Sequence, residues 1–182
     1  MPTYPREEVQ ATVDRWLAAN KRAWVDHNWR ALAEFYTDDA VYIYDTGPFG
    51  TVEARGIDQI RDICLGADMG GWENWTYPYE TVVIDNDQVM ARWWSRGPGK
   101  RADGSYYQAM GMSWFRYGGN GKWREQVDLF DLSKLLVLAD EMGDSIKPDL
   151  RQKLDLAKQL ITEMFKGGSV GLNVDEAFGR NG

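Results

Sequence analysis

A carboxylate stands inside a strand-like segment that follows the most aromatic part of the sequence. In WREQVDLFDLSK, residues 123–134, apolar residues flank Asp128 on both sides. Alternate side chains of a strand share a face, so Asp128 points the same way as Gln126 and Phe130. On an apolar pocket face, partial desolvation raises the pKa of such a carboxyl group towards neutrality, and the group can exchange a proton with a substrate. On a solvated face, or bonded to a neighbouring strand or turn, Asp128 has a structural role only.

Other kinds of chemistry have too few residues to support them. Cys64 is the only cysteine and His27 the only histidine, which argues against an intrachain disulfide, a thiolate metal cluster or a multi-histidine metal site. Neither a Ser-His-Asp relay nor a redox cofactor motif is indicated. We therefore expect no metal and no cofactor.

Composition narrows the class of protein further. A chain of 182 residues with 43% hydrophobic content suits one globular domain. Its net charge of -7 disfavours nucleic-acid binding, and no segment resembles a signal peptide or a membrane span. We expect a soluble, cytoplasmic protein. Nine Trp, nine Tyr and six Phe exceed what a small core needs, so some rings are expected to line a cavity.

Hydrophobic periodicity predicts helices at the beginning and at the end of the chain, with strands between them. The N-terminal half is predicted to contain a helix from about Thr3 to Trp24, a second helix capped by Asp26, a strand over 40–45 and a helix over 56–67. Further strands are predicted over 74–84, 88–96, 105–117 and 122–131, and further helices, the first capped by Asp131, over 132–143 and 147–166. Short, turn-rich links between the strands favour antiparallel pairing and the α+β class.

The order of these elements, with NWRALAEFYTDDAVYIYD, ARGIDQIRDI and the terminal WREQVDLFD, resembles the SnoaL-like branch of the nuclear-transport-factor-2-like superfamily over roughly residues 8–135. The resemblance implies a strongly curved antiparallel sheet wrapped around the N-terminal helices to form a cone-shaped pocket. We therefore expect a cone domain over residues 1–135, and a C-terminal helical extension with a flexible tail over 136–182. Relatives include isomerases, cyclases, dehydratases, epoxide hydrolases, cofactor-free lyases and non-catalytic binding domains, so the fold alone does not choose the reaction.

Two site residues are carried over from the epoxide hydrolases of this superfamily. Their terminal RDYFD-like pattern, whose first Asp is catalytic, falls on VDLFD and places that role on Asp128. Their strand tyrosine, which precedes a Pro turn and holds the reacting water, matches Tyr44 in YDTGP. Tyr42 shares the face of Tyr44, and Asp45 is a reserve acid or base beside the bend. Alternatively, Tyr44 only packs in the pocket wall with its hydroxyl bonded locally.

The segment VMARWWSR departs from the hydrolase pattern. Those enzymes place an Arg and an Asp two residues apart here, whereas the corresponding positions hold Trp94 and Arg96, with Arg92 on the same face. The second carboxylate is missing, which disfavours epoxide hydrolysis, while Arg96 would neutralise an oxyanion. Alternatively, Arg92 and Arg96 lie on the convex face and Trp93 turns inward.

Further aromatic side chains are expected to bind the substrate. Tyr107 shares with Gly111 a parity that the resemblance turns inward, which suits a flat ring packed beside small residues. Trp72 lies in the Gly-rich segment GADMGGWENW, which is typical of a loop at the edge of a pocket. Phe130 shares the face of Asp128.

The residues and the resemblance together predict a cofactor-independent enzyme that performs acid/base chemistry of the lyase, isomerase, dehydratase or hydrolase type. Asp128, Tyr44 and Arg96 are its expected catalytic residues, and its expected substrate is a hydrophobic aromatic or polycyclic small molecule. The alternative is a ligand-binding or protein-interaction domain of the same fold without catalysis. Either protein is expected to form a homodimer, because relatives usually pair through the sheet.

Overall fold

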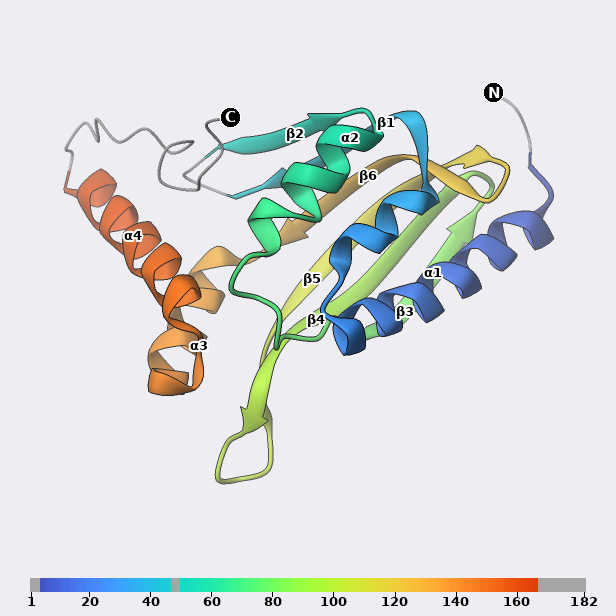
Figure 1. Cartoon of the computed structure of the whole chain (residues 1–182). Coiled ribbons are helices and arrows are strands. Elements are labelled where there is room, and N and C mark those ends of the chain that lie inside the picture. Colours follow the sequence, from blue (N-terminus) through green and yellow to red (C-terminus); the bar gives the residue numbers. More distant parts are fainter. Residues whose placement is uncertain (1–3, 47–49, 167–182) are drawn as a thin grey trace.

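Six strands form one curved sheet, and helices pack on its concave side (Figure 1). The computed structural model describes residues 4–46 and 50–166. The strands are β1 Tyr36–Asp45, β2 Thr51–Arg55, β3 Tyr79–Asp85, β4 Gln88–Lys100, β5 Tyr106–Gly119 and β6 Lys122–Phe130. Their order across the sheet is β2-β1-β6-β5-β4-β3, and every neighbouring pair is antiparallel except β1 and β6. The predicted α+β fold, with its curved sheet around N-terminal helices, is confirmed.

The N-terminal helices form the apolar layer that packs against the concave face of the sheet. They are α1 Arg6–Asp26, the 3-10 helix η1 Trp29–Phe35, and the short helix α2 Ile57–Gln59, which continues into η3 Ile60–Cys64 and is followed by η4 Ala67–Met69. In α1, Val9, Val13 and Trp16 recur at helical spacing and are buried. Trp16 meets the rings of four aromatic residues from η1 and the sheet, edge-on, at 5.3–6.5 Å between centroids. This aromatic packing fixes α1 against the concave face.

One local expectation was wrong, and one strand was not predicted. The predicted second helix is a 3-10 helix preceded by Asn28, whereas Asp26, the expected cap, is the last residue of α1. The strand β2 was not predicted, because TVEAR pairs with only one neighbour at the edge of the sheet and carries little apolar alternation. The turn expected after the strand over 40–45 includes residues 47–49, which lie outside the described residues.

Two further helices follow the sheet, as predicted: α3 Leu132–Met142 and α4 Pro148–Phe165. Asp131 caps α3, since its Oδ1 accepts a hydrogen bond of 3.2 Å from the amide of Lys134. The division into domains at residue 135 falls within α3 and stays a prediction. The predicted tail begins beyond the described residues.

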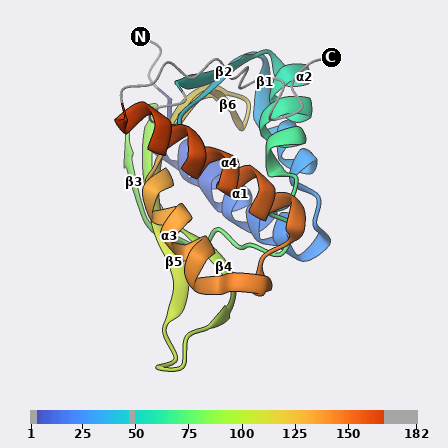
Figure 2. The ribbon, with the colours of Figure 1, turned by 90° about the vertical axis from the view of Figure 1, so that its left-hand side faces the viewer.

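These C-terminal helices have their own apolar cluster and lie beside the open side of the sheet. Leu138, Met142, Leu150 and Leu154 pack there around Trp75. Figure 2 shows α4 crossing in front of α1. Within the described part of the chain, no helix is long and apolar enough to cross a membrane.

Candidate active site

A cavity of about 180 Å³ lies between the concave face of the sheet and the N-terminal helices. About half of its lining residues are aromatic. Trp16 comes from α1, Trp29 from η1 and Trp93 from β4, and five tyrosines and Phe130 add further rings. The cavity therefore suits a hydrophobic ring compound.

Asp128 is the acidic group placed deepest in this aromatic wall. It lies on β6 with only 8% of its surface exposed, and its strand neighbours across the sheet are Tyr44 and Ser113. Tyr42 Oη donates to Asp128 Oδ2 at 2.6 Å. Gln126 Nε2 lies 2.9 Å from Oδ1 and 3.0 Å from Oδ2. The buried carboxyl group is thus held by neutral donors rather than by a cation.

Two further hydrogen bonds, from Trp93 and from Tyr36, decide that Ser113 and Gln126 donate to Asp128. The indole of Trp93 donates to Ser113 Oγ at 2.8 Å, which leaves the Ser113 proton for a bond to Asp128. Tyr36 donates to Gln126 Oε1, which turns the Gln126 amino group towards the carboxylate. Both relays therefore end on Asp128 as an acceptor.

Burial raises the pKa of Asp128 above its ordinary value, and the bonds from Ser113, Tyr42 and Gln126 offset part of that rise. Burial also raises the pKa of Tyr42 well above its ordinary value, and the charge of Asp128 adds to this rise. Tyr42 therefore stays a protonated donor at physiological pH. A carboxyl group with a raised pKa beside an apolar cavity has the properties of a general base or acid.

Tyr44 presents a different hydroxyl to the same space. Its side chain is 9% exposed and lines the cavity, and its ring lies 6.4 Å from that of Phe130. The buried hydroxyl has no hydrogen-bond partner among the residues that the structure describes. Such a group can donate to an oxygen of a bound ligand without breaking a bond of the fold.

Five of the ten predicted site residues line the cavity, namely Asp128, Tyr44, Tyr42, Phe130 and Trp72. They come from β1, β6 and the segment that follows η4, which are far apart in sequence. The parallel pairing of β1 with β6 sets Tyr44 directly beside Asp128.

Three residues of β4 were expected on the pocket face and lie on the opposite face instead. Trp93 and Ser95 line the cavity, so the alternation of β4 turns Arg92, Trp94 and Arg96 outward. Arg92 pairs with Glu80 at 2.9 Å. The guanidinium of Arg96 donates to Gln108 at 2.9 Å and lies 3.9 Å from the ring centre of Tyr106. The expected position of Arg96 at the reacting centre was wrong.

Tyr107 and Asp45 also lie outside the cavity lining. Tyr107 has the inward parity that was expected, but it sits nearer the end of the hairpin, where its ring lies 4.7 Å from the guanidinium of Arg101. Asp45 is exposed at the end of β1. At Gly111 the neighbouring ring belongs to the protein itself, since a Cβ atom there would lie 2.3 Å from the Trp93 indole.

Several residues of the site were not predicted as site residues from the sequence, although the alternative that turns Trp93 inward was considered. Gln126, Ser113 and Tyr79 surround Asp128, and Trp93 closes the wall beside them. Gln126 could have been found, because it shares the face of Asp128 in β6. Ser113 carried a weaker signal, as the next residue of inward parity after Gly111.

The cavity lining carries acidic groups and no basic groups among the described residues. Among the described lining residues, only Asp68 and Asp128 are ionisable to a charge near neutral pH, and none is Lys, Arg or His. No group of three or more His, Cys, Asp or Glu residues in the described ranges could hold a metal ion. The site thus offers one buried carboxyl group, neutral donors and rings.

Comparison with known proteins agrees with this architecture. The crystal structure of a candidate SnoaL-like polyketide cyclase from Jannaschia sp. CCS1 is similar with a TM-score of 0.53 and 17% identity, covering 81% of this chain and 99% of that one. A candidate isomerase from Bacillus subtilis has a TM-score of 0.53 and 15% identity, covering 74% and 94%. A phenazine biosynthesis-related protein from Pseudomonas aeruginosa has a TM-score of 0.52 and 13% identity, covering 72% and 91%.

These identities are low, so the solved structures support the fold alone. No curated protein matches the chain. A family model described as a SnoaL-like domain matches residues 13–126, which is more than half of the sequence. The chain therefore belongs to the SnoaL-like domain family.

Proposed function

We propose that the protein is a cofactor-independent enzyme that performs acid/base chemistry on an uncharged, hydrophobic ring compound. Asp128 takes or gives the proton, and Tyr44 donates to an oxygen of the substrate. The observation that carries this proposal is the buried carboxyl group of Asp128, which faces an aromatic cavity and accepts bonds from neutral donors only. Lyase, isomerase, dehydratase and hydrolase reactions all need such a group.

The charge of the lining supports an uncharged substrate. An anionic ligand would meet Asp68 and Asp128 in a desolvated space, with no lining cation to compensate. Rings stacked against Trp93 and its neighbours would instead gain contact on several sides. The substrate class that we propose is therefore an aromatic or polycyclic alcohol, ketone or phenol.

A base-sensitive probe tests the role of Asp128 without knowledge of the substrate. 5-Nitrobenzisoxazole is a neutral bicyclic compound. When a base removes its C3 proton, the N–O bond breaks and a cyano-substituted nitrophenolate forms, which is measured by absorbance. We expect the wild-type protein to open this ring faster than free acetate does, and Asp128→Asn to lose the acceleration.

One outcome would contradict the role of Asp128, and another would contradict the enzymatic role. An unchanged rate in Asp128→Asn would show that another group is the base. Saturable binding of the probe with no acceleration over acetate would favour the alternative of a ligand-binding domain. Asp45→Asn is the matched control, because it removes an exposed carboxylate outside the cavity lining and should leave the rate unchanged.

We also propose that the protein acts as a cytoplasmic homodimer that pairs through the convex face of the sheet. Large exposed apolar side chains gather there on β3 to β6, namely Val83, Met90, Met110, Met112, Trp114 and Leu129. Strand register sets Met90 beside Trp114, and Met112 beside Leu129. The ion pairs Arg92–Glu80 and Arg116–Glu125 lie on the same face, so both signs of charge are available to a second copy.

The dimer is tested by sedimentation. We expect the wild-type chain to sediment as a dimer and Met112→Lys to sediment as a monomer with the same circular dichroism. A wild-type monomer at micromolar concentration would refute the dimer. We propose the cytoplasmic setting because Cys64 is the only cysteine of the sequence, so the chain forms no intrachain disulfide that would need an oxidising compartment.

A further inference from the structure

One wall of the cavity is built from a segment with little regular structure. We call residues 66–75 the wall segment. It contributes Asp68, Met69 and Trp72 to the cavity lining. Apart from the three-residue helix η4, it contains neither helix nor strand. Its position must therefore be set by contacts with other elements.

The helix α4 makes several of these contacts. The ammonium group of Lys153 donates to the carbonyl oxygen of Gly70 at 2.8 Å and lies 3.3 Å from that of Ala67. Lys147, at the start of the helix, pairs with Glu73 at 2.9 Å. Both lysines thus hold the backbone or a side chain of the wall segment from outside the cavity.

The electrostatics of Glu73 agree with a strong contact. Partial burial raises its pKa, but the hydrogen bonds from the Gly71 amide and from Lys147 outweigh this effect and lower the pKa to about 2. Glu73 therefore carries its charge throughout the physiological range and keeps the pair with Lys147.

Close packing adds to the polar contacts. Gly71 has a positive φ of 91°, and a Cβ atom there would lie 2.9 Å from both the amide nitrogen and the Cβ of Leu150. The backbone of the wall segment therefore touches α4 without an intervening side chain. Only glycine satisfies both the close approach and the backbone conformation.

The core of the C-terminal helices continues through the wall segment to the cavity. Trp75 is fully buried in the cluster that contains Leu138 and Leu150. Its ring meets that of Trp72, edge-on, at 4.9 Å between centroids, and Trp72 lines the cavity. The side chain of Leu135 from α3 reaches the cavity directly.

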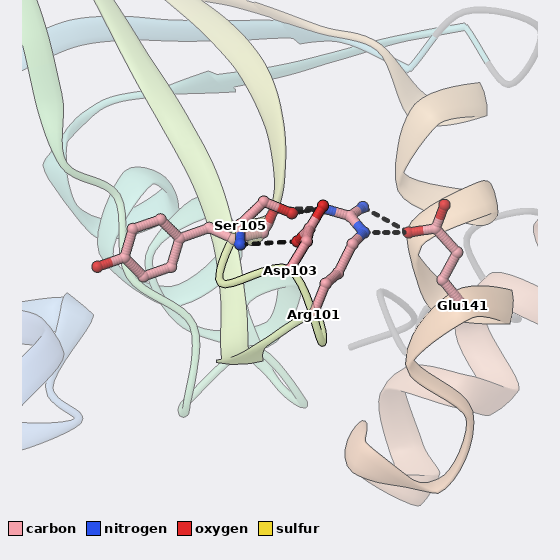
Figure 3. A network of polar contacts seen from close by, with 5 residues as sticks. Arg101, Asp103, Ser105 and Glu141 are labelled. Carbon is pink, nitrogen blue, oxygen red and sulfur yellow. Dashed lines mark hydrogen bonds and ion pairs between the residues drawn. The ribbon is translucent and has the colours of Figure 1, made fainter.

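The helix α3 also contacts the β4–β5 hairpin. Figure 3 shows the guanidinium of Arg101 between Ser105 and Glu141, with its Nε 3.1 Å from Oε2 of Glu141 on α3. Asp103 steadies the hairpin by accepting from the Ser105 amide at 2.9 Å. The matched family domain ends at residue 126, so α3 and α4 lie beyond it.

We propose that α4 is a specificity-determining part of the site, which holds the wall segment in place and thereby sets the size and affinity of the ligand. This inference rests on the proposed function in one respect, namely that the cavity binds a small ring compound. The contacts that carry it are those of Lys147, Lys153 and Leu150 with the wall segment.

A matched pair of double variants tests the inference. Lys147→Met/Lys153→Met removes two ammonium groups that contact the wall segment. Lys158→Met/Lys166→Met removes two from the same helix, and these pair with Asp140 and Glu163, outside the wall segment. Both variants change the net charge equally, and Met keeps the apolar stem of each side chain.

Two measurements apply to wild type and both variants, namely hydrogen exchange of residues 66–75 and calorimetric titration with 2-naphthol. We expect exchange in the wall segment to become about tenfold faster in Lys147→Met/Lys153→Met, while the control stays within about twofold of wild type. We expect the Kd for 2-naphthol to rise about three- to tenfold in the first variant only, because the loosened wall must be ordered on binding.

The possible results separate the two proposals. Equal exchange rates in the two variants would overturn the inference, as would faster exchange with an unchanged Kd. A wild-type protein that does not bind 2-naphthol would instead count against the proposed function, while the exchange rates would still decide whether α4 holds the wall segment.

Discussion

Replacement of Tyr42 or Tyr44 by Phe makes the same chemical change at two positions of strand β1. Both line the cavity from β1. The hydroxyl of Tyr42 donates to Asp128 at 2.6 Å, whereas that of Tyr44 has no partner within the described ranges. Tyr→Phe removes one oxygen in each case. The difference between the two variants in free energy of unfolding therefore measures the bond to Asp128.

The expected magnitudes differ clearly. A hydrogen bond to a charged group contributes about 1.5–3 kcal/mol, so Tyr42→Phe should lower the free energy of unfolding by about that amount near neutral pH. At about 2–4 °C per kcal/mol for a domain of this size, its Tm falls by about 3–12 °C. Tyr44→Phe loses no bond and removes a buried hydroxyl without a partner, so its Tm stays within about 2 °C of wild type or rises.

The stability loss in Tyr42→Phe should depend on pH, because it depends on the charge of Asp128. The bond from Tyr42 lowers the pKa of Asp128, so it favours the ionised carboxylate. Its contribution is present where Asp128 is charged and is lost as the pH falls through the pKa of the folded protein. The deficit of Tyr42→Phe should therefore shrink towards acid pH, while Tyr44→Phe shows no such trend.

Thermal unfolding followed by circular dichroism, over about pH 4 to 8, measures both variants. Equal losses of Tm in the two variants would refute the reasoning that only one of the hydroxyls is bonded in the fold. Turnover of 5-nitrobenzisoxazole adds a second reading. We expect Tyr44→Phe to slow it at unchanged stability, because the hydroxyl stabilises the phenolate oxygen that leaves.

Three further predictions concern the same cavity. Burial raises the pKa of Asp128, so ionising this group in the folded protein costs stability as the pH rises above the unfolded pKa of about 3.9. In urea unfolding, Asp128→Asn should therefore gain stability relative to wild type as the pH rises from about 4 to 8. A stability difference that is independent of pH would contradict the raised pKa. Gly111→Ala places a Cβ atom 2.3 Å from the Trp93 ring, so its urea midpoint should correspond to a loss of about 1–3 kcal/mol, and a neutral result would show that the ring can move freely. In calorimetry, 2-naphthylmethanol should bind at least about tenfold more tightly than 2-naphthoate, because the lining holds carboxylates and no cation; similar affinities would contradict the uncharged substrate class.

Parts of the fold and the site could be predicted from short-range patterns. Helical spacing of apolar residues located α1, α3 and α4, and the position of Asp131 before α3 predicted its capping role. Within β6, alternation alone grouped Gln126, Asp128 and Phe130, all of which line the cavity. Such patterns suffice because each depends on the geometry of one element.

Other features depended on packing between elements. Both faces of β4 carry a tryptophan, so alternation could not decide whether Trp93 or Trp94 turns inward. The packing of Trp93 over Gly111 of β5, and its bond to Ser113, settle this choice and turn Arg96 outward.

The site, too, depends partly on local sequence patterns and partly on packing between elements. The sequence by itself determined which residues share a face of a strand, and it placed a carboxylate and a phenol on such faces. Only the tertiary structure decided that Asp128 and Tyr44 are neighbours, because β1 and β6 are distant in sequence and pair in parallel. It also set the wall segment against α4, through contacts that no local pattern encodes. The physical reason is that alternation fixes relative orientation within a strand, whereas the concave face and its partners are chosen by how the whole sheet buries its apolar area.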